Sequence, residues 1–156
     1  MTMRTMLTVF LLTLAAIAAP VDAKPSETEV RETLSKFIQA FDNLDWDGFR
    51  GFFADDATVF YPRDVPIRAT GHREIEAQFQ KVFEQIRGKR SKPPYMHIQP
   101  RSLAIQMFGD VAVATFHLDD RPGELNRRTI VLHRDGGTWK IVHIHASEVA
   151  LPKSER

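Results

Sequence analysis

The chain has no cysteine among its 156 residues. Disulfide bonds are therefore excluded, and the fold must be held by its hydrophobic core alone. If the protein is exported, this absence fits a bacterial periplasm or exterior better than a disulfide-rich eukaryotic secreted module.

The sequence also lacks an excess of either charge. Its 21 Lys and Arg residues nearly balance 20 Asp and Glu residues, for a net charge of +1. Nothing in this balance favours nucleic acid as a partner. The basic run RGKRSK at 87–92 is short and lies where a helix is expected to end. We interpret it as a solvated loop rather than a phosphate-binding patch.

Only the N-terminus carries a long apolar run, over residues 6–19, which follows a single charge at Arg4. The run is shorter than the roughly 20 apolar residues that a membrane-spanning helix needs. Val21 and Ala23 place small residues at −3 and −1 of a cut before Lys24, as in secretory signals. We predict a signal peptide over 1–23 and a single periplasmic or secreted domain over 24–156, with no membrane contact after cleavage; the alternative is an uncleaved anchor.

Apolar spacing in the rest of the chain predicts three helices and then a group of strands. Residues 26–45 have helical periodicity and begin with a capping-box pattern, Ser26 with Glu29. A short helix over 46–54 and a longer one over 71–88 flank a strand at 57–62. From residue 95 the period becomes two, which predicts strands at 95–108, 111–118, 127–135 and 138–149. This order indicates an α+β fold in which a curved antiparallel sheet wraps around three N-terminal helices.

Two motifs carry a family resemblance. LDWDGFRGFFADDATVFYP resembles the second helix and first strand of SnoaL-like and ketosteroid-isomerase-like proteins, in the nuclear transport factor 2-like (NTF2-like) superfamily. LHRDGGTWKIVHIHAS is similar to the end of a SnoaL-like subfamily and of the calcium/calmodulin-dependent kinase II association domain. The resemblance implies a cystatin-like/NTF2-like cone with a pocket at its open end. Because that superfamily includes enzymes, ligand binders and oligomerisation hubs, the fold names no reaction.

The isomerase residues do not carry over. The resemblance puts Phe37 where the isomerase has an oxyanion-binding tyrosine, and Tyr61 where it has its general base. Phenylalanine has no hydroxyl, and a phenol with a pKa near 10 is a poor base at neutral pH. The second acid would fall near Thr129 or Ile130, and neither is acidic. The isomerase mechanism is therefore not expected here, and the kinase hub's pocket arginines are not reproduced either.

The pair His143 and His145 allows three interpretations. Alternation along 139–147 puts both on the same strand face as Trp139, although a slip of one residue would exchange the two faces. They could lie on the outer sheet face and form a dimer interface with Trp139. They could instead bind a ligand or act in catalysis, or bind a metal ion if other ligands converge on them. We expect the interface, with no metal and no cofactor.

Other candidates surround the expected pocket. Arg63 and Arg68, beside the loop after the first strand, could clamp a carboxylate or phosphate. Phenylalanines, of which we expect eight to wall the cone, favour an apolar ligand. As ligand-binding candidates we take Phe37, Tyr61, Arg63, Arg68, His117 and Arg128, and as catalytic candidates Tyr61, His97 and His117.

Two functions follow from these residues. We expect a homodimeric domain that binds a small apolar or acidic molecule in the cone, and whether it is an enzyme stays open. The alternative is a lyase, isomerase or hydrolase that uses a His/Tyr acid–base pair. The two differ in whether His117, Tyr61 and a carboxylate meet in a pocket or phenylalanines fill the cone.

Overall fold

The computed structural model describes residues 24–62, 67–118 and 123–152, so the predicted signal segment lies outside the described residues. Within these ranges, no helix has both the length and the apolar character needed to cross a membrane.

The three predicted helices are present. α1 (Glu27–Asp42) begins with the expected capping box, in which Ser26 Oγ accepts from the Glu29 N–H and a Glu29 carboxylate oxygen accepts from the Ser26 N–H, both at 3.3 Å. α2 (Trp46–Arg50) is shorter than predicted, because the chain is already extended at Phe53. α3 (Gly71–Arg87) ends within a residue of its predicted end.

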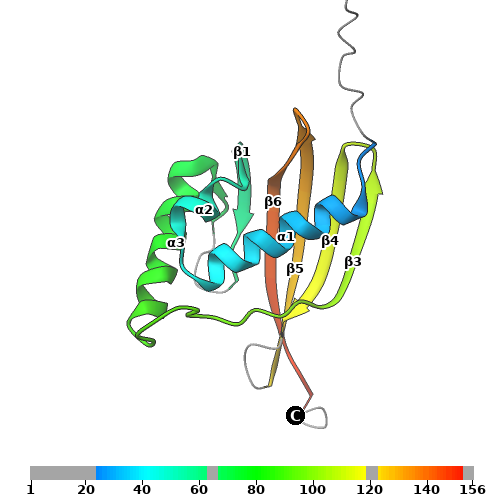
Figure 1. Ribbon diagram of the computed structural model, residues 1–156. Helices are drawn as coiled ribbons and strands as arrows, with labels where there is room; N and C mark the ends of the chain where they lie inside the picture. The colour runs from blue at the N-terminus through cyan, green and yellow to red at the C-terminus, as the bar shows by residue number, and fades with distance from the viewer. Residues whose placement is uncertain (1–23, 63–66, 119–122, 153–156) are drawn as a thin grey trace, which may run out of the picture.

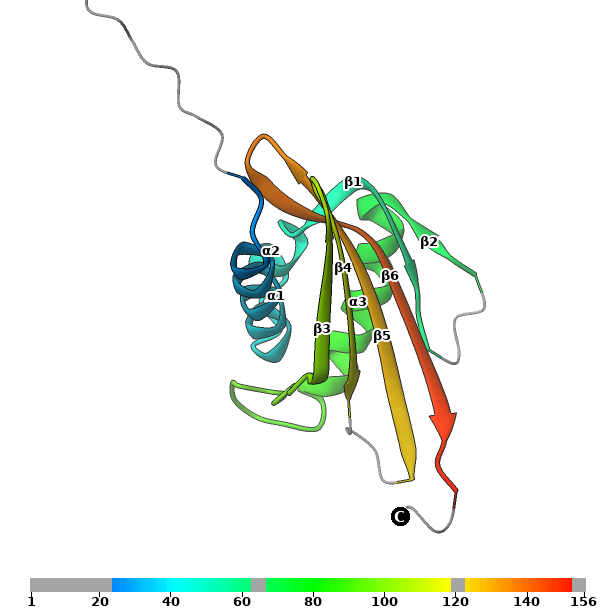
Figure 2. The same cartoon turned by 90° about the vertical axis from the view of Figure 1, so that its right-hand side faces the viewer.

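Six strands form one curved sheet in the order β2-β1-β6-β5-β4-β3 (Figures 1 and 2). Their bounds are β1 (Phe53–Phe60), β2 (Ala69–Thr70), β3 (Arg101–Phe108), β4 (Val111–Leu118), β5 (Glu124–Asp135) and β6 (Thr138–Ala150). Neighbouring strands are antiparallel, except that β1 runs parallel to β6. Figure 1 shows α1 running across one face of the sheet and α3 beside β1. The predicted α+β class and curved sheet are confirmed.

β3 and β2 differ most from prediction, and β1 starts at Phe53 rather than at residue 57. β3 starts at Arg101 rather than at residue 95, because the chain before it is fastened to the end of α1 instead of a strand. The N–H groups of Tyr95 and Met96 both donate to the Asp42 carbonyl, at 2.7 and 3.1 Å. The short strand β2 was not predicted, since two residues carry no periodicity.

The helix-covered face of the sheet, called the inner face below, is apolar over its centre. Cross-strand pairing aligns its side chains in rows that reach from β3 to β1. The two central rows are Met107–Ala112–Leu132–Ile141–Phe53 and Ile105–Ala114–Ile130–Ile144–Val59.

A cluster of phenylalanines fills the space between the helices and β1. Phe49 is fully buried at its centre and stacks on Phe37, with ring centroids 4.7 Å apart. Its other ring contacts are Phe41, Trp46, Phe53, Phe79 and Phe83. One of the eight phenylalanines expected to wall the cone does not: Phe108 is 61% exposed at the end of an edge strand.

A β-bulge in β6 changes which residues share a face. Val131 pairs with His143 but Leu132 pairs with Ile141, so Val142 is an extra residue. Before the bulge, Trp139 is buried, and its indole N–H donates to Glu29 at 3.2 Å. After it, Ile144 and Ala146 are buried. The prediction that Trp139 shares a face with the two histidines is therefore wrong, because the extra residue shifts the alternation by one.

Candidate functional site

The outer face of the sheet has an uncharged centre, called the central patch below. Two rows of side chains cross five strands without an acidic or basic residue other than histidine. They are Gln106–Val113–Val131–His143–Thr58 and Ala104–Thr115–Thr129–His145–Phe60. Phe60 is 38% exposed here. A solvated sheet face is normally polar and carries charges, so this patch is unusual for a surface in water.

The two histidines of the patch are held differently. His143 is half-buried, and its Nδ1 lies 2.8 Å from the Thr58 hydroxyl, whereas His145 is exposed. Both rings contact Phe60, with centroids 5.9 and 5.7 Å away. Burial lowers the pKa of His143, and the nearby His145 and Arg68 lower it further. His143 is therefore more readily neutral than an ordinary histidine.

Tyr61 lies on the opposite side of the sheet. It follows β1, packs edge-on against Phe79 with centroids 5.2 Å apart, and donates its hydroxyl to the Ile75 carbonyl at 3.3 Å. Burial raises the pKa of Tyr61 well above its ordinary value. A phenol that is harder to ionise and bonded to α3 is suited to structure rather than to proton abstraction.

Polar side chains appear on the inner face where β5 begins, and we call them the polar end. Asn126 is only 1% exposed, and its cross-strand partners are Leu118 and Glu148. Arg128 shares its face and lies between Phe116 and Ala146. Its guanidinium donates to the Arg127 carbonyl at 3.0 Å. Polar groups at the end of an apolar interior are typical of a place where a small molecule is oriented.

The remaining candidates are dispersed. Phe37 is part of the buried aromatic cluster, Arg68 is exposed, and Arg63 lies outside the described residues. His97 is exposed near Asp42. Burial raises the pKa of Asp42 above its ordinary value, and a hydrogen bond from the Ile98 N–H and the nearby His97 offset part of this rise. His117 is on the outer face, with Arg101 and Arg127 as cross-strand partners.

The proposed His/Tyr acid–base pair is not assembled. His117 and Tyr61 occupy opposite faces of the sheet, and His97 lies beside Asp42 at the end of α1. Strand alternation could have predicted that His117 points away from the interior, because its apolar neighbours Phe116 and Leu118 take the opposite face. The structure therefore does not bring His117 and Tyr61 together in one site.

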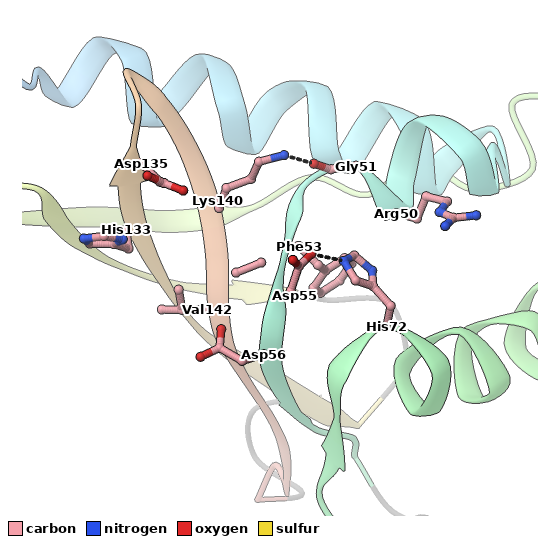
Figure 3. Close-up of a pocket in the computed structure, with 11 residues that line it drawn as sticks. Arg50, Gly51, Phe53, Asp55, Asp56, His72, His133, Asp135, Lys140 and Val142 are labelled. Atoms are coloured by element: carbon pink, nitrogen blue, oxygen red, sulfur yellow. Dashed lines mark hydrogen bonds and ion pairs between the residues drawn. The ribbon is translucent and has the colours of Figure 1, made fainter.

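An open groove of about 660 Å³ lies where α2, α3 and the bulged part of β1 meet β5 and β6 (Figure 3). His72 Nε2 is 3.2 Å from the Asp55 carboxylate, and Lys140 donates to the Gly51 carbonyl at 2.6 Å. The Asp55 side chain is fully exposed, so water screens this pair. Among the described residues, no three His, Cys, Asp or Glu side chains gather closely enough to hold a metal ion.

Three residues of these sites escaped the sequence reasoning. Asn126 has the same parity as Ile130 and Leu132, so strand alternation could have marked it as an inward polar residue. Phe60 could have been recognised as outward by the same alternation. Thr58 carried no local signal, because its partner His143 is 85 positions away.

Comparison with known proteins agrees with this architecture. Residues 30–152 match the model of the SnoaL-like domain. No match was found among curated proteins.

Three solved structures illustrate the range of similar proteins. An NTF2-like protein of unknown function from Pseudomonas putida KT2440 is 24% identical, with a TM-score of 0.64 over 78% of this chain and 84% of that one. A protein from Parabacteroides distasonis, provisionally named a ketosteroid isomerase, is 18% identical, with a TM-score of 0.60 over 83% and 97%. The hub of the S. rosetta calcium/calmodulin-dependent kinase II is 25% identical, with a TM-score of 0.57 over 80% and 99%.

These names differ from one another, so the structural likeness supports a fold and not one activity. The family match covers most of the chain and includes the central patch, the polar end and the aromatic cluster. By this match, the chain belongs to the SnoaL-like domain family.

Proposed function

We propose that this protein is a non-catalytic domain that pairs with a second copy of itself through the outer face of its sheet. The observation that carries the proposal is the central patch, whose two rows cross five strands without an acidic, lysine or arginine side chain. Apolar and hydroxyl side chains can pack closely against an identical surface without burying unpaired charge.

The size of the face fits this role. Five strands about 4.8 Å apart, which share a length of about eight residues, present a surface of about 600 Å². Standard stable interfaces bury about 800 Å² on each partner, so a dimer would use this face and part of its rim. The similar protein named as a kinase hub is consistent with a fold that supports association.

The test compares two lysine substitutions. Phe60→Lys puts a charge into the central patch, whereas Ile67→Lys puts the same charge on a residue that is 76% exposed outside it. We expect the wild type and Ile67→Lys to sediment as dimers at micromolar concentration and Phe60→Lys to sediment as a monomer. A wild-type chain that stays monomeric at high micromolar concentration contradicts the proposal.

A second function is favoured by the polar end. Arg128 and the buried Asn126 lie on the inner face next to Phe116 and Ala146, on the side of the sheet that also holds Tyr61. An arginine between apolar side chains can pair with a carboxylate while its surroundings contact an aromatic ring. The domain would therefore bind a small, largely apolar acid.

Neighbouring arginines give this idea a matched control. Arg127 and Arg128 are adjacent in β5 but point to opposite faces. With 1-naphthoate as the probe and uncharged 2-naphthol as its comparison, NMR titration of the wild type should show tighter binding of the acid. Arg128→Gln should weaken the binding of 1-naphthoate by about tenfold or more, as expected for a lost hydrogen bond to a charged group. Equal effects of Arg127→Gln and Arg128→Gln would remove the support for an inner site.

We also propose that the domain is exported and processed before Lys24. The basis is the arrangement of a charge, a short apolar run and small residues in the leader. Mass spectrometry of the protein from a bacterial periplasm should find an N-terminus at Lys24. Recovery of the intact leader from the cytoplasm would contradict export.

A further inference from the structure

The spacing of His143 and His145 is suited to chelation. They are two residues apart on β6, beyond the bulge, so both point to the outer face with Cα atoms about 7 Å apart. Both rings contact the same Phe60 ring, which shows that they lean toward β1 together. Metal–nitrogen bonds of about 2.0–2.1 Å require the two ligating nitrogens to be about 3 Å apart, which rings leaning together can reach.

A hydrogen-bonded chain orients the first of these rings. The Thr58 hydroxyl donates to the Val142 carbonyl at 3.5 Å, so its oxygen is left to accept a hydrogen bond. His143 Nδ1 lies 2.8 Å from that oxygen. In the tautomer with the proton on Nδ1, the ring donates to Thr58 and Nε2 keeps its lone pair and faces away from Thr58, which is the tautomer that metal binding requires. A histidine whose second nitrogen is held by a neighbouring group is the usual arrangement at metal sites.

We propose that His143 and His145 form a two-histidine clamp that binds a divalent transition-metal ion. Neutral imidazoles favour Cu²⁺, Ni²⁺ and Zn²⁺, with Cu²⁺ held most tightly. The described residues bring no third His, Asp or Glu to the clamp, so water completes the coordination. His143 and His145 belong to the central patch, so a metal ion and a second copy of the chain compete for this surface, and the clamp is a property of the uncovered face.

The electrostatic surroundings limit the affinity and supply a sensitive test. Arg68 lies close enough to His143 to oppose positive charge there. A bound divalent ion experiences the same repulsion, so binding should be modest in the wild type and stronger once Arg68 is neutral. A role for the histidines in surface packing alone would not produce an increase of this kind.

The experiment is calorimetric titration of the whole chain, without an affinity tag, with Ni²⁺ and Zn²⁺. We expect one class of site that is lost in His143→Gln and in His145→Gln. Thr58→Val, which leaves both ligands in place, should weaken binding by about tenfold, the usual cost of losing a group that orients a ligand. Arg68→Gln should strengthen it. The control variants His133→Gln and His97→Gln, both at exposed histidines, should bind like the wild type.

Several results would overturn the clamp. One is binding by the double variant His143→Gln/His145→Gln that equals the wild type, and another is no binding by the wild type at millimolar metal. Unchanged affinity in both Thr58→Val and Arg68→Gln would show that the histidines act only as scattered surface ligands. Sedimentation of the same samples separates this proposal from association. A wild type that is monomeric before metal is added and binds metal supports the clamp and contradicts the dimer. A wild type that is dimeric and binds no metal supports the dimer and contradicts the clamp.

Discussion

Replacing Phe49 with alanine is expected to remove a large part of the stability of the domain. Phe49 is fully buried, with a relative solvent exposure of 0%, and it contacts six aromatic rings. Buried Phe→Ala substitutions cost about 3–5 kcal/mol, through lost apolar burial and the cavity that remains. We expect the upper part of that range, because the neighbouring rings belong to three helices and a strand that cannot all move inward. Domains of this size are stable by about 5–15 kcal/mol, so the loss is about a quarter or more of the total.

The assay is urea unfolding followed by tryptophan fluorescence and circular dichroism. Trp46, whose ring centroid is 5.9 Å from that of Phe49, reports on the site directly. Phe108→Ala, at a position 61% exposed, is the control and should change the unfolding free energy by less than about 0.5 kcal/mol. If Phe49→Ala does not fold, Phe49→Leu provides the measurement, with an expected cost of about 1 kcal/mol. A cost below about 1.5 kcal/mol for Phe49→Ala would show that the cluster is loosely packed and would contradict a filled interior.

Three further predictions concern Glu29, Tyr61 and the isomerase reaction. The hydrogen bond from Trp139 lowers the pKa of Glu29 below its ordinary 4.5, and the Ser26 N–H and the charge of Arg134 lower it further. This shift stabilises the fold above that pH, and the stability is lost as the pH falls through the lowered pKa. In Glu29→Gln, the urea unfolding midpoint should therefore fall less steeply as the pH is lowered, and the same pH dependence as in the wild type would refute the contact. Glu32→Gln, exposed on the same helix, is the control. Tyr61→Phe removes the bond to the Ile75 carbonyl and should cost about 1 kcal/mol in urea unfolding, whereas an unaltered midpoint would mean that the bond contributes nothing. Because the resemblance puts Phe37 and Tyr61 where the isomerase has functional residues, we expect no turnover of a Δ5-3-ketosteroid in a spectrophotometric assay, and clear turnover would overturn that comparison.

The order of helices and strands along the chain was predictable where the pattern was long and regular. Ser26 and Glu29 marked the start of α1 correctly, since a capping box depends on residues three apart in sequence. The period of two located β4, β5 and β6 to within a few residues. β1 began earlier than predicted because Phe53 pairs with Ile141, a contact far along the chain that overrides local helix preference.

The sites were harder to predict, because they depend on register. The extra residue Val142 puts Trp139 on the opposite sheet face from His143 and His145, and nothing in WKIVHIHAS shows whether a bulge is present. The hydrogen bond between Thr58 and His143 likewise forms only once β1 has paired with β6. The residue types in the sites could therefore be read from the sequence, but which of them share a face could not.

Self-association through the central patch is tested most directly by cysteine cross-linking. The natural chain has no cysteine, so one introduced cysteine is a unique probe. Thr129→Cys places it on the central strand of the patch, and Ser35→Cys places it on the exposed side of α1. Treatment with a short bismaleimide should link most Thr129→Cys chains as dimers at micromolar concentration and leave Ser35→Cys chains unlinked. Equal cross-linking of both variants, or of neither, would contradict a dimer built on the outer face of the sheet.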